Sequence, residues 1–126
     1  MKRIFFAIGA LLSAVLICTA GYFILVDTCE KLESTLNEVV YFAERNDTEK
    51  ALKKAEEVAK QWDDIHGRIE AVVNHAETDE LEELIKSLPV YARLGNTERL
   101  CEKTEIAINR LHHIIKNEKV LISNIL

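Results

Sequence analysis

Residues that interrupt helices are rare in this chain. Among 126 residues, proline occurs once and glycine four times. Two of those glycines, Gly9 and Gly21, fall inside an uncharged N-terminal run. This scarcity leaves little material for the turns that connect strands. Abundant Ala, Leu, Glu, Lys and Ile favour helix instead, so we expect an all-α protein.

Several signatures of chemistry are missing as well. The sequence has no glycine-rich phosphate loop, no HExxH and no CxxC. None of its four serines has the local setting of a nucleophile elbow. We therefore expect no enzymatic activity, no catalytic residue and no cofactor.

Charge is absent from residues 4–26 and abundant after them. Residues 27–126 hold all 21 acids and all of the 16 bases except Lys2 and Arg3. An acidic outer part does not attract phosphate backbones, so we expect no nucleic-acid partner. The uncharged run is long enough to cross the hydrocarbon layer, which takes about 20 helical residues. Because bases precede the run and Asp27 follows it, the N-terminus is expected in the cytoplasm and the remainder outside.

The chain thus divides into a membrane anchor over residues 1–26 and an extracytoplasmic helical domain over residues 27–126. A cleaved signal peptide is the alternative, since Cys18-Thr19-Ala20 is a tolerable cleavage site. The apolar run continues beyond Ala20 and exceeds the usual signal core of about 7–15 residues. We favour an uncleaved, single-pass anchor in the cell membrane.

Apolar residues at steps of three and four predict four helices in the outer part. The first continues directly from the anchor, and the second, over residues 48–76, has the clearest pattern. Asn46 and Glu49 stand at capping-box spacing before it. Thr78 is expected to cap the third helix, and Thr97 begins a fourth that continues to the end of the chain.

The two halves of the outer part resemble each other in sequence. Residues 32–66 align with residues 81–115 at an offset of 49, with eight of 35 positions identical, including Thr48/Thr97. This predicts two helical hairpins of similar design that form an antiparallel four-helix bundle. A short helical-repeat array is the alternative architecture.

Three histidines and one aspartate are candidate metal ligands. If the second and fourth helices both run toward the membrane, His66, His112 and His113 lie at similar depths, and Asp63 lies at a matching level. Such a set could hold zinc. We favour the simpler interpretation that His66 flanks the core and the other two are solvated, so no metal site is expected.

A second possible cluster is His75 with Glu77. We interpret His75 more simply as a histidine at the C-terminus of the second helix, where the helix dipole favours it. Trp62 lies in the richest apolar stripe and is expected in the core.

The cysteines are not expected to pair within one chain. Cys29 lies just above the membrane and Cys101 near the far tip, which the first helix separates by roughly 25 Å. A disulfide tolerates only about 4.4–6.8 Å between α-carbons. Cys29 could still cross-link two chains.

The end of the chain is apolar and is expected to dock on the bundle rather than stay in water. Docking into the lipid interface and binding of a partner are the alternatives. The residues concerned are Val120, Leu121, Ile122, Ile125 and Leu126.

Three stretches carry a family resemblance: Trp62 after the Lys/Glu/Ala-rich start of the second helix, the run HAETDELE at residues 75–82, and residues 111–126 from Leu-His-His-Ile to Asn-Ile-Leu. With the N-terminal span, they resemble the domain of unknown function 4363 family. Its members are small single-span membrane proteins of Gram-positive bacteria. Ile115 departs from the family pattern, which has a proline there. The resemblance implies a cell-membrane location and a helical ectodomain, and it assigns no functional residue.

These features predict a non-catalytic binding or scaffolding module with a protein partner at the outer face of the cell membrane. Long amphipathic helices offer grooves for partner helices. The alternative is a sensor or carrier domain that binds a small ligand or metal within the bundle. It requires convergent polar groups, and His66 with His112 is the candidate for them.

We expect the anchor to stay on the mature protein, because the apolar run extends past Ala20. The intact mass of the membrane-extracted protein will then equal that of the whole chain. Loss of the first 20 residues would show that the segment is a signal peptide.

Overall fold

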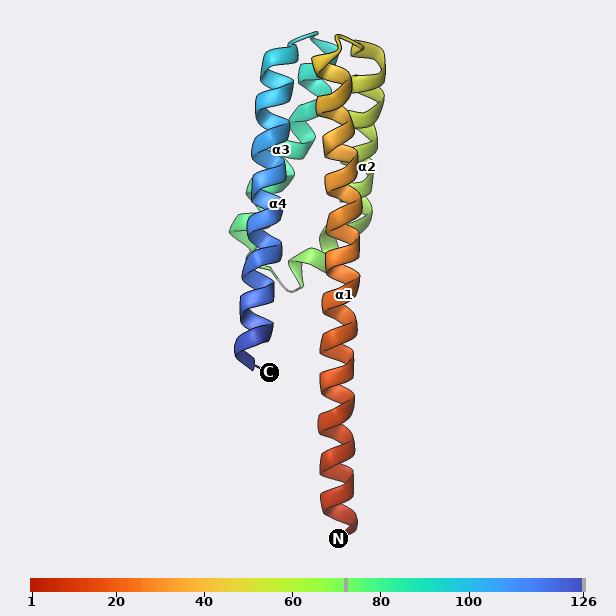
Figure 1. Cartoon of the computed structure of the whole chain (residues 1–126), viewed down its shortest axis with the longest axis vertical. Helices are drawn as coiled ribbons and strands as arrows, with labels where there is room; N and C mark the ends of the chain where they lie inside the picture. Colours follow the sequence, from red (N-terminus) through yellow and green to blue (C-terminus); the bar gives the residue numbers. More distant parts are fainter. Residues whose placement is uncertain (72, 126) are drawn as a thin grey trace.

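In the computed structural model, four helices make up almost the whole chain (Figure 1). The structure describes every residue except Val72 and Leu126, and leaves undescribed the side chains of Leu121, Ile122 and Ile125. The expected antiparallel four-helix bundle is confirmed. Its elements are α1 (Lys2–Glu44), α2 (Thr48–Glu70), α3 (His75–Arg93) and α4 (Thr97–Ile125).

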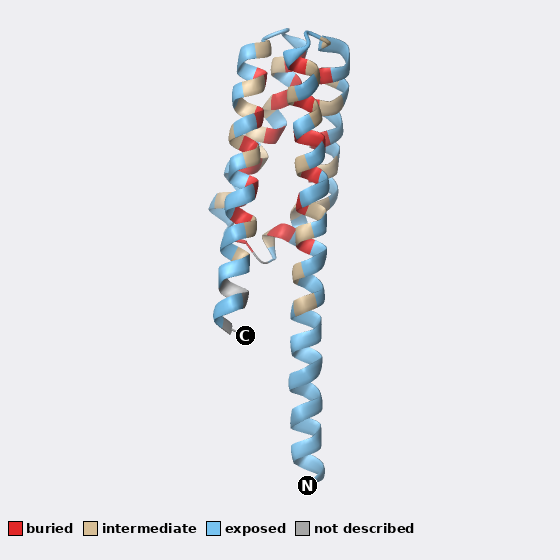
Figure 2. Ribbon diagram, viewed as in Figure 1, coloured by how far each residue is buried: buried red, intermediate tan, exposed pale blue. Residues whose placement is uncertain are grey.

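The helix α1 is shared by the apolar N-terminal segment and the bundle, as expected. It runs without interruption for 43 residues. Its lower half extends beyond the other helices and is exposed, whereas its upper half is buried along one stripe (Figure 2). Among the described residues, one helix, α1, is long enough and apolar enough to cross a membrane. An N-terminal signal sequence shares this property. The stripe comprises Leu25, Cys29, Leu32, Thr35, Leu36, Val39 and Ala43.

The helices are arranged in a ring in chain order, in which α2 and α4 each pack on both α1 and α3. Small side chains, Ala43, Ala51 and Ala92, allow close approach near one end of the bundle. Large side chains fill the rest of the core. Trp62, which is 1% exposed, is one of them, so its expected core position is confirmed.

The two connections at the distal tip, residues 45–47 and 94–96, have the same geometry. Asn46 and Gly95 occupy equivalent positions at the offset of 49 and both have positive φ, 57° and 67°. The next residues, Asp47 and Asn96, each accept a hydrogen bond at 3.2 Å from the backbone N–H three residues later. The expected pair of similar hairpins is therefore present. The capping box assigned to Asn46 is wrong, because Asn46 forms the left-handed turn and Asp47 is the cap.

The connection at the base, residues 71–74, corrects the predicted helix ends. α2 stops at Glu70 rather than Ala76. Apolar spacing continued past this end because Val73 packs into the core from the connection, with 7% of its surface exposed. Asn74 caps α3 by accepting from the N–H of Ala76 at 2.9 Å. Thr78, the expected cap, is buried within the helix instead.

The last turns of α4 extend below the base (Figure 1). Val120, at the start of the apolar end, has 51% of its surface exposed. The prediction that the apolar end packs on the bundle depends on Leu121, Ile122, Ile125 and Leu126, which lie outside the described side chains and residues.

Leu36→Ala should destabilise the bundle. Leu36 is fully buried, and a Leu→Ala change at such a site costs about 2–5 kcal/mol through lost burial and the cavity it leaves. Leu94→Ala is the matched control, because Leu94 is 74% exposed and should change the free energy of unfolding by about 0.5 kcal/mol or less. Denaturant unfolding of the full chain in micelles measures both. Equal effects would contradict the placement of the core.

Candidate functional site

A groove lies at the base, between α1 and the end of the bundle. It has a volume of about 700 Å³. One wall is the N-terminal segment itself, and Ile69 at the end of α2 closes the top. The residues that line it are almost all apolar or small: Ala14, Val15, Ile17, Cys18, Thr19, Gly21, Tyr22, Ile24, Leu25, Thr28, Arg68, Ile69 and Glu118.

Two charged residues stand at this groove, Arg68 from α2 and Glu118 from α4. Burial raises the pKa of the Glu118 carboxyl above its usual range, and the negative charge of Glu77 adds to the effect. Neither Arg68 nor Glu118 was singled out from the sequence. The sequence did show that charged residues of the fourth helix end at Lys119. This observation points to a groove only once the structure shows which helices lie beside the fourth.

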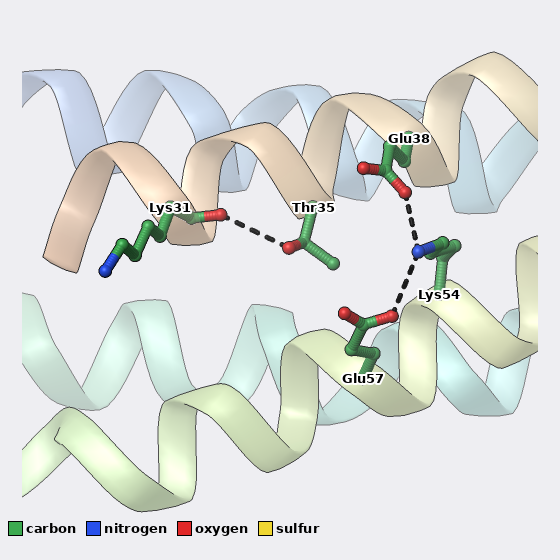
Figure 3. A network of polar contacts seen from close by, with 5 residues as sticks. All are labelled: Lys31, Thr35, Glu38, Lys54 and Glu57. Atoms are coloured by element: carbon green, nitrogen blue, oxygen red, sulfur yellow. Dashed lines mark hydrogen bonds and ion pairs between the residues drawn. The ribbon is translucent and has the colours of Figure 1, made fainter. Parts of the chain in front are cut away.

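Each seam between neighbouring helices carries a polar contact. Lys54 on α2 bonds Glu38 on α1 at 2.7 Å and Glu57 on its own helix at 3.1 Å (Figure 3). These two carboxylates raise the pKa of the Lys54 ammonium. Arg110 on α4 pairs with Glu80 on α3 at 3.0 Å. Exposed pairs of this kind contribute little to the free energy of unfolding because solvent screens them, so they serve alignment more than stability.

On α2, Asp63 is exposed and His66 is half-buried. The Asp63 carboxylate pairs with Lys86 on α3. The Nδ1 atom of His66 lies 3.1 Å from the backbone carbonyl oxygen of Asp63, and its ring stacks on Trp62 with centroids 6.5 Å apart. His66 thus flanks the core through Trp62, as we favoured.

His112 is on another seam. Its Nε2 atom lies 2.6 Å from a carboxylate oxygen of Glu33 on α1. α2 and α4 occupy opposite corners of the ring, so the structure does not bring His66 and His112 together. His113 is exposed and lies 3.3 Å from the side chain of Asn117. No group of three or more His, Cys, Asp or Glu side chains suited to a metal occurs among the residues that the structure describes.

His75 is the first residue of α3, not the last part of α2. Its interpretation as a C-terminal histidine is therefore wrong, because the helix dipole is positive where it stands. The error follows from the apolar spacing that Val73 carried past the true end of α2.

A comparison with known protein families matches residues 19–125 to a domain of unknown function, DUF4363. The chain belongs to this family. No curated protein and no solved structure matches the chain. DUF4363 membership confirms the resemblance drawn from Trp62 and the two histidine-containing stretches, and the match covers the bundle together with the upper part of the apolar segment.

The three cysteines of this DUF4363 chain are free thiols. Cys29 is completely buried between α1 and its neighbours, so it is not placed to cross-link two chains. Burial raises the pKa of the Cys29 thiol from 9.0 to about 11, and the charges of Glu30 and Glu33 add to the rise. Burial also raises the pKa of Cys101, helped by Glu44 and Glu105. A thiol with a raised pKa is a poor nucleophile at neutral pH.

The buried thiol predicts a pH dependence of stability. The folded state keeps Cys29 protonated up to about pH 11, whereas the unfolded state releases this proton near pH 9. Stability from this group is therefore complete below pH 9 and lost between pH 9 and 11, at about 1.4 kcal/mol per pH unit at most. Unfolding of Cys29→Ala should lack this part of the slope. Parallel pH profiles for the two proteins would refute the burial effect.

Proposed function

We propose that this chain is a non-catalytic binding or scaffolding module, anchored in the cell membrane by residues 4–26, with its bundle on the outer face. The observation that carries the proposal is the continuity of α1. A single helix with no linker joins an apolar segment of membrane-spanning length to the bundle. A domain held in this way stays at a defined height above the bilayer.

The interior of the bundle supports binding at its surface rather than within it. The buried threonines, Thr35, Thr78 and Thr104, each donate to a carbonyl of their own helix or its cap. Two other buried polar atoms, Gln61 Oε1 and Trp62 Nε1, have no hydrogen-bond partner among the described residues. A small cavity near the tip, beside Ala51 and Leu100, measures about 10 Å³. That is room for roughly one water molecule, so the described core offers little to the alternative of a ligand or metal inside the bundle.

Exposed apolar side chains of the bundle support a protein partner. Leu94, at the distal tip, is 74% exposed, and Tyr41 and Val90 near the same end are 50% and 45% exposed. A photo-reactive residue at Leu94 should therefore cross-link one specific protein in living cells, whereas the same residue at Asn109, exposed midway along α4, should not. Equal products at both positions, or none at either, would count against a partner at the tip.

The orientation gives a second test. Glu98→Cys places an exposed thiol at the tip, and Lys2→Cys places one before the anchor. With Cys18 and Cys101 replaced by alanine, a membrane-impermeant maleimide should label the Glu98→Cys protein in intact cells. The Lys2→Cys protein should be labelled only after permeabilisation, because the basic end stays in the cytoplasm. The reverse pattern would place the bundle inside the cell.

A further inference from the structure

The contact between Glu33 and His112 fixes the register of the two neighbouring helices α1 and α4. Since the helices are antiparallel, equal steps from this contact toward the base stay at similar heights. Six steps lead to Asp27 on α1 and to Glu118 on α4. Beyond them, the last turns of α4 continue below the base alongside the lower part of α1, as Figure 1 shows for the two ribbons.

The internal repeat marks the same height. At the offset of 49, Glu70 at the end of α2 corresponds to Lys119 on α4, and His75 at the start of α3 corresponds to Val26 on α1. The helices α2 and α3 stop at this level and are joined by the connection at the base. The helices α1 and α4 both continue beyond it.

Charge ends at this level on both continuing helices. On α1, Asp27 pairs with Lys31 at 3.2 Å, and residues 4–26 below them are uncharged. On α4, Lys119 is the last charged residue, and residues 120–126 are uncharged. Counted from the tip, where α1 ends at Glu44 and α4 begins at Thr97, the last charge lies 17 residues down α1 and 22 residues down α4. The two antiparallel helices therefore change from charged to uncharged within about 8 Å of one another, although they approach this level from opposite chain directions. A water–hydrocarbon boundary requires such a change on every helix that crosses it.

We propose that the last turns of α4, residues 120–125, are embedded in the bilayer leaflet beneath the bundle, beside the span, and that lipid acyl chains occupy the groove that the span lines together with Ile69 and Glu118. The inference rests on the proposed anchoring of residues 4–26. Six helical residues descend about 9 Å, which matches the depth of about 5–10 Å that interfacial helices reach.

Lipid is the occupant that the groove favours. One wall consists of residues 14–25 of the span itself, so anything that fills the groove shares the hydrocarbon layer with them. Outside α1, the lining residues are Ile69, Arg68 and Glu118. A second copy of the chain would have to bring its own apolar surface into this layer, whereas acyl chains are already there.

Three exposed valines allow a matched test in the full chain. Val15 lies midway along the span, Val120 begins the embedded turns, and Val90 lies in the upper part of α3; they are 39%, 51% and 45% exposed. Each is changed singly to cysteine with Cys18 and Cys101 replaced by alanine, and Cys29 stays because it is buried. An environment-sensitive fluorophore is attached, and the protein is reconstituted in phosphatidylcholine vesicles that contain lipids with a nitroxide quencher at a shallow or a deep position.

The probe at Val120→Cys should lose more emission to the shallow quencher than to the deep one. The probe at Val15→Cys should show the opposite order, and the probe at Val90→Cys should lose none to either. Quenching at position 15 without quenching at 120 would overturn the embedding of α4 and leave the anchor intact. Absence of quenching at position 15 would overturn both. Emission at position 120 that falls with protein density, and not with nitroxide lipid, would indicate a second copy in the groove and also refute the proposal.

Discussion

The arrangement of this protein depends on one uninterrupted helix that forms both the exposed apolar segment and one side of the bundle core. α1 passes from an exposed apolar segment into the core of the bundle, and the stripe from Leu25 to Ala43 provides the surface on which α2 and α4 pack. Because the first packed side chain lies one residue before the end of the uncharged run, the bundle begins where the apolar segment ends. The base connection and the groove both lie close to that point.

The helices and their pairing into two antiparallel hairpins could be predicted from the sequence, because the core is built from apolar side chains at helical spacing. The repeat at offset 49 even indicated the two tips, where Asn46 and Gly95 share a left-handed backbone. The base could not be read in the same way. Val73 keeps helical spacing while it packs from a connection, and nothing in a spacing pattern distinguishes a buried side chain on a helix from one on a loop that closes its end.

The candidate ligands show a different limit. Depth along a helix follows from counting residues, so His66 and His112 were placed at similar heights. Whether they meet depends on which helices are neighbours and on how each helix is rotated, and α2 and α4 stand at opposite corners of the ring. The partner of His112, Glu33, lies 79 positions away in the chain and carries no local mark. The groove was equally hidden, since its walls come from segments near both ends of the sequence and from the end of α2.

A helix without a joint behaves as a lever. The stretch of α1 from Val26 to Glu44 measures about 27 Å at 1.5 Å per residue. Spanning helices adjust to bilayer thickness by tilting, on average by about 20°. A tilt of that size would carry the distal tip sideways by roughly 9 Å, since no flexible segment lies between span and bundle to absorb it. In the proposed membrane-anchored arrangement, the position of the tip would therefore follow the thickness of the bilayer around residues 4–26.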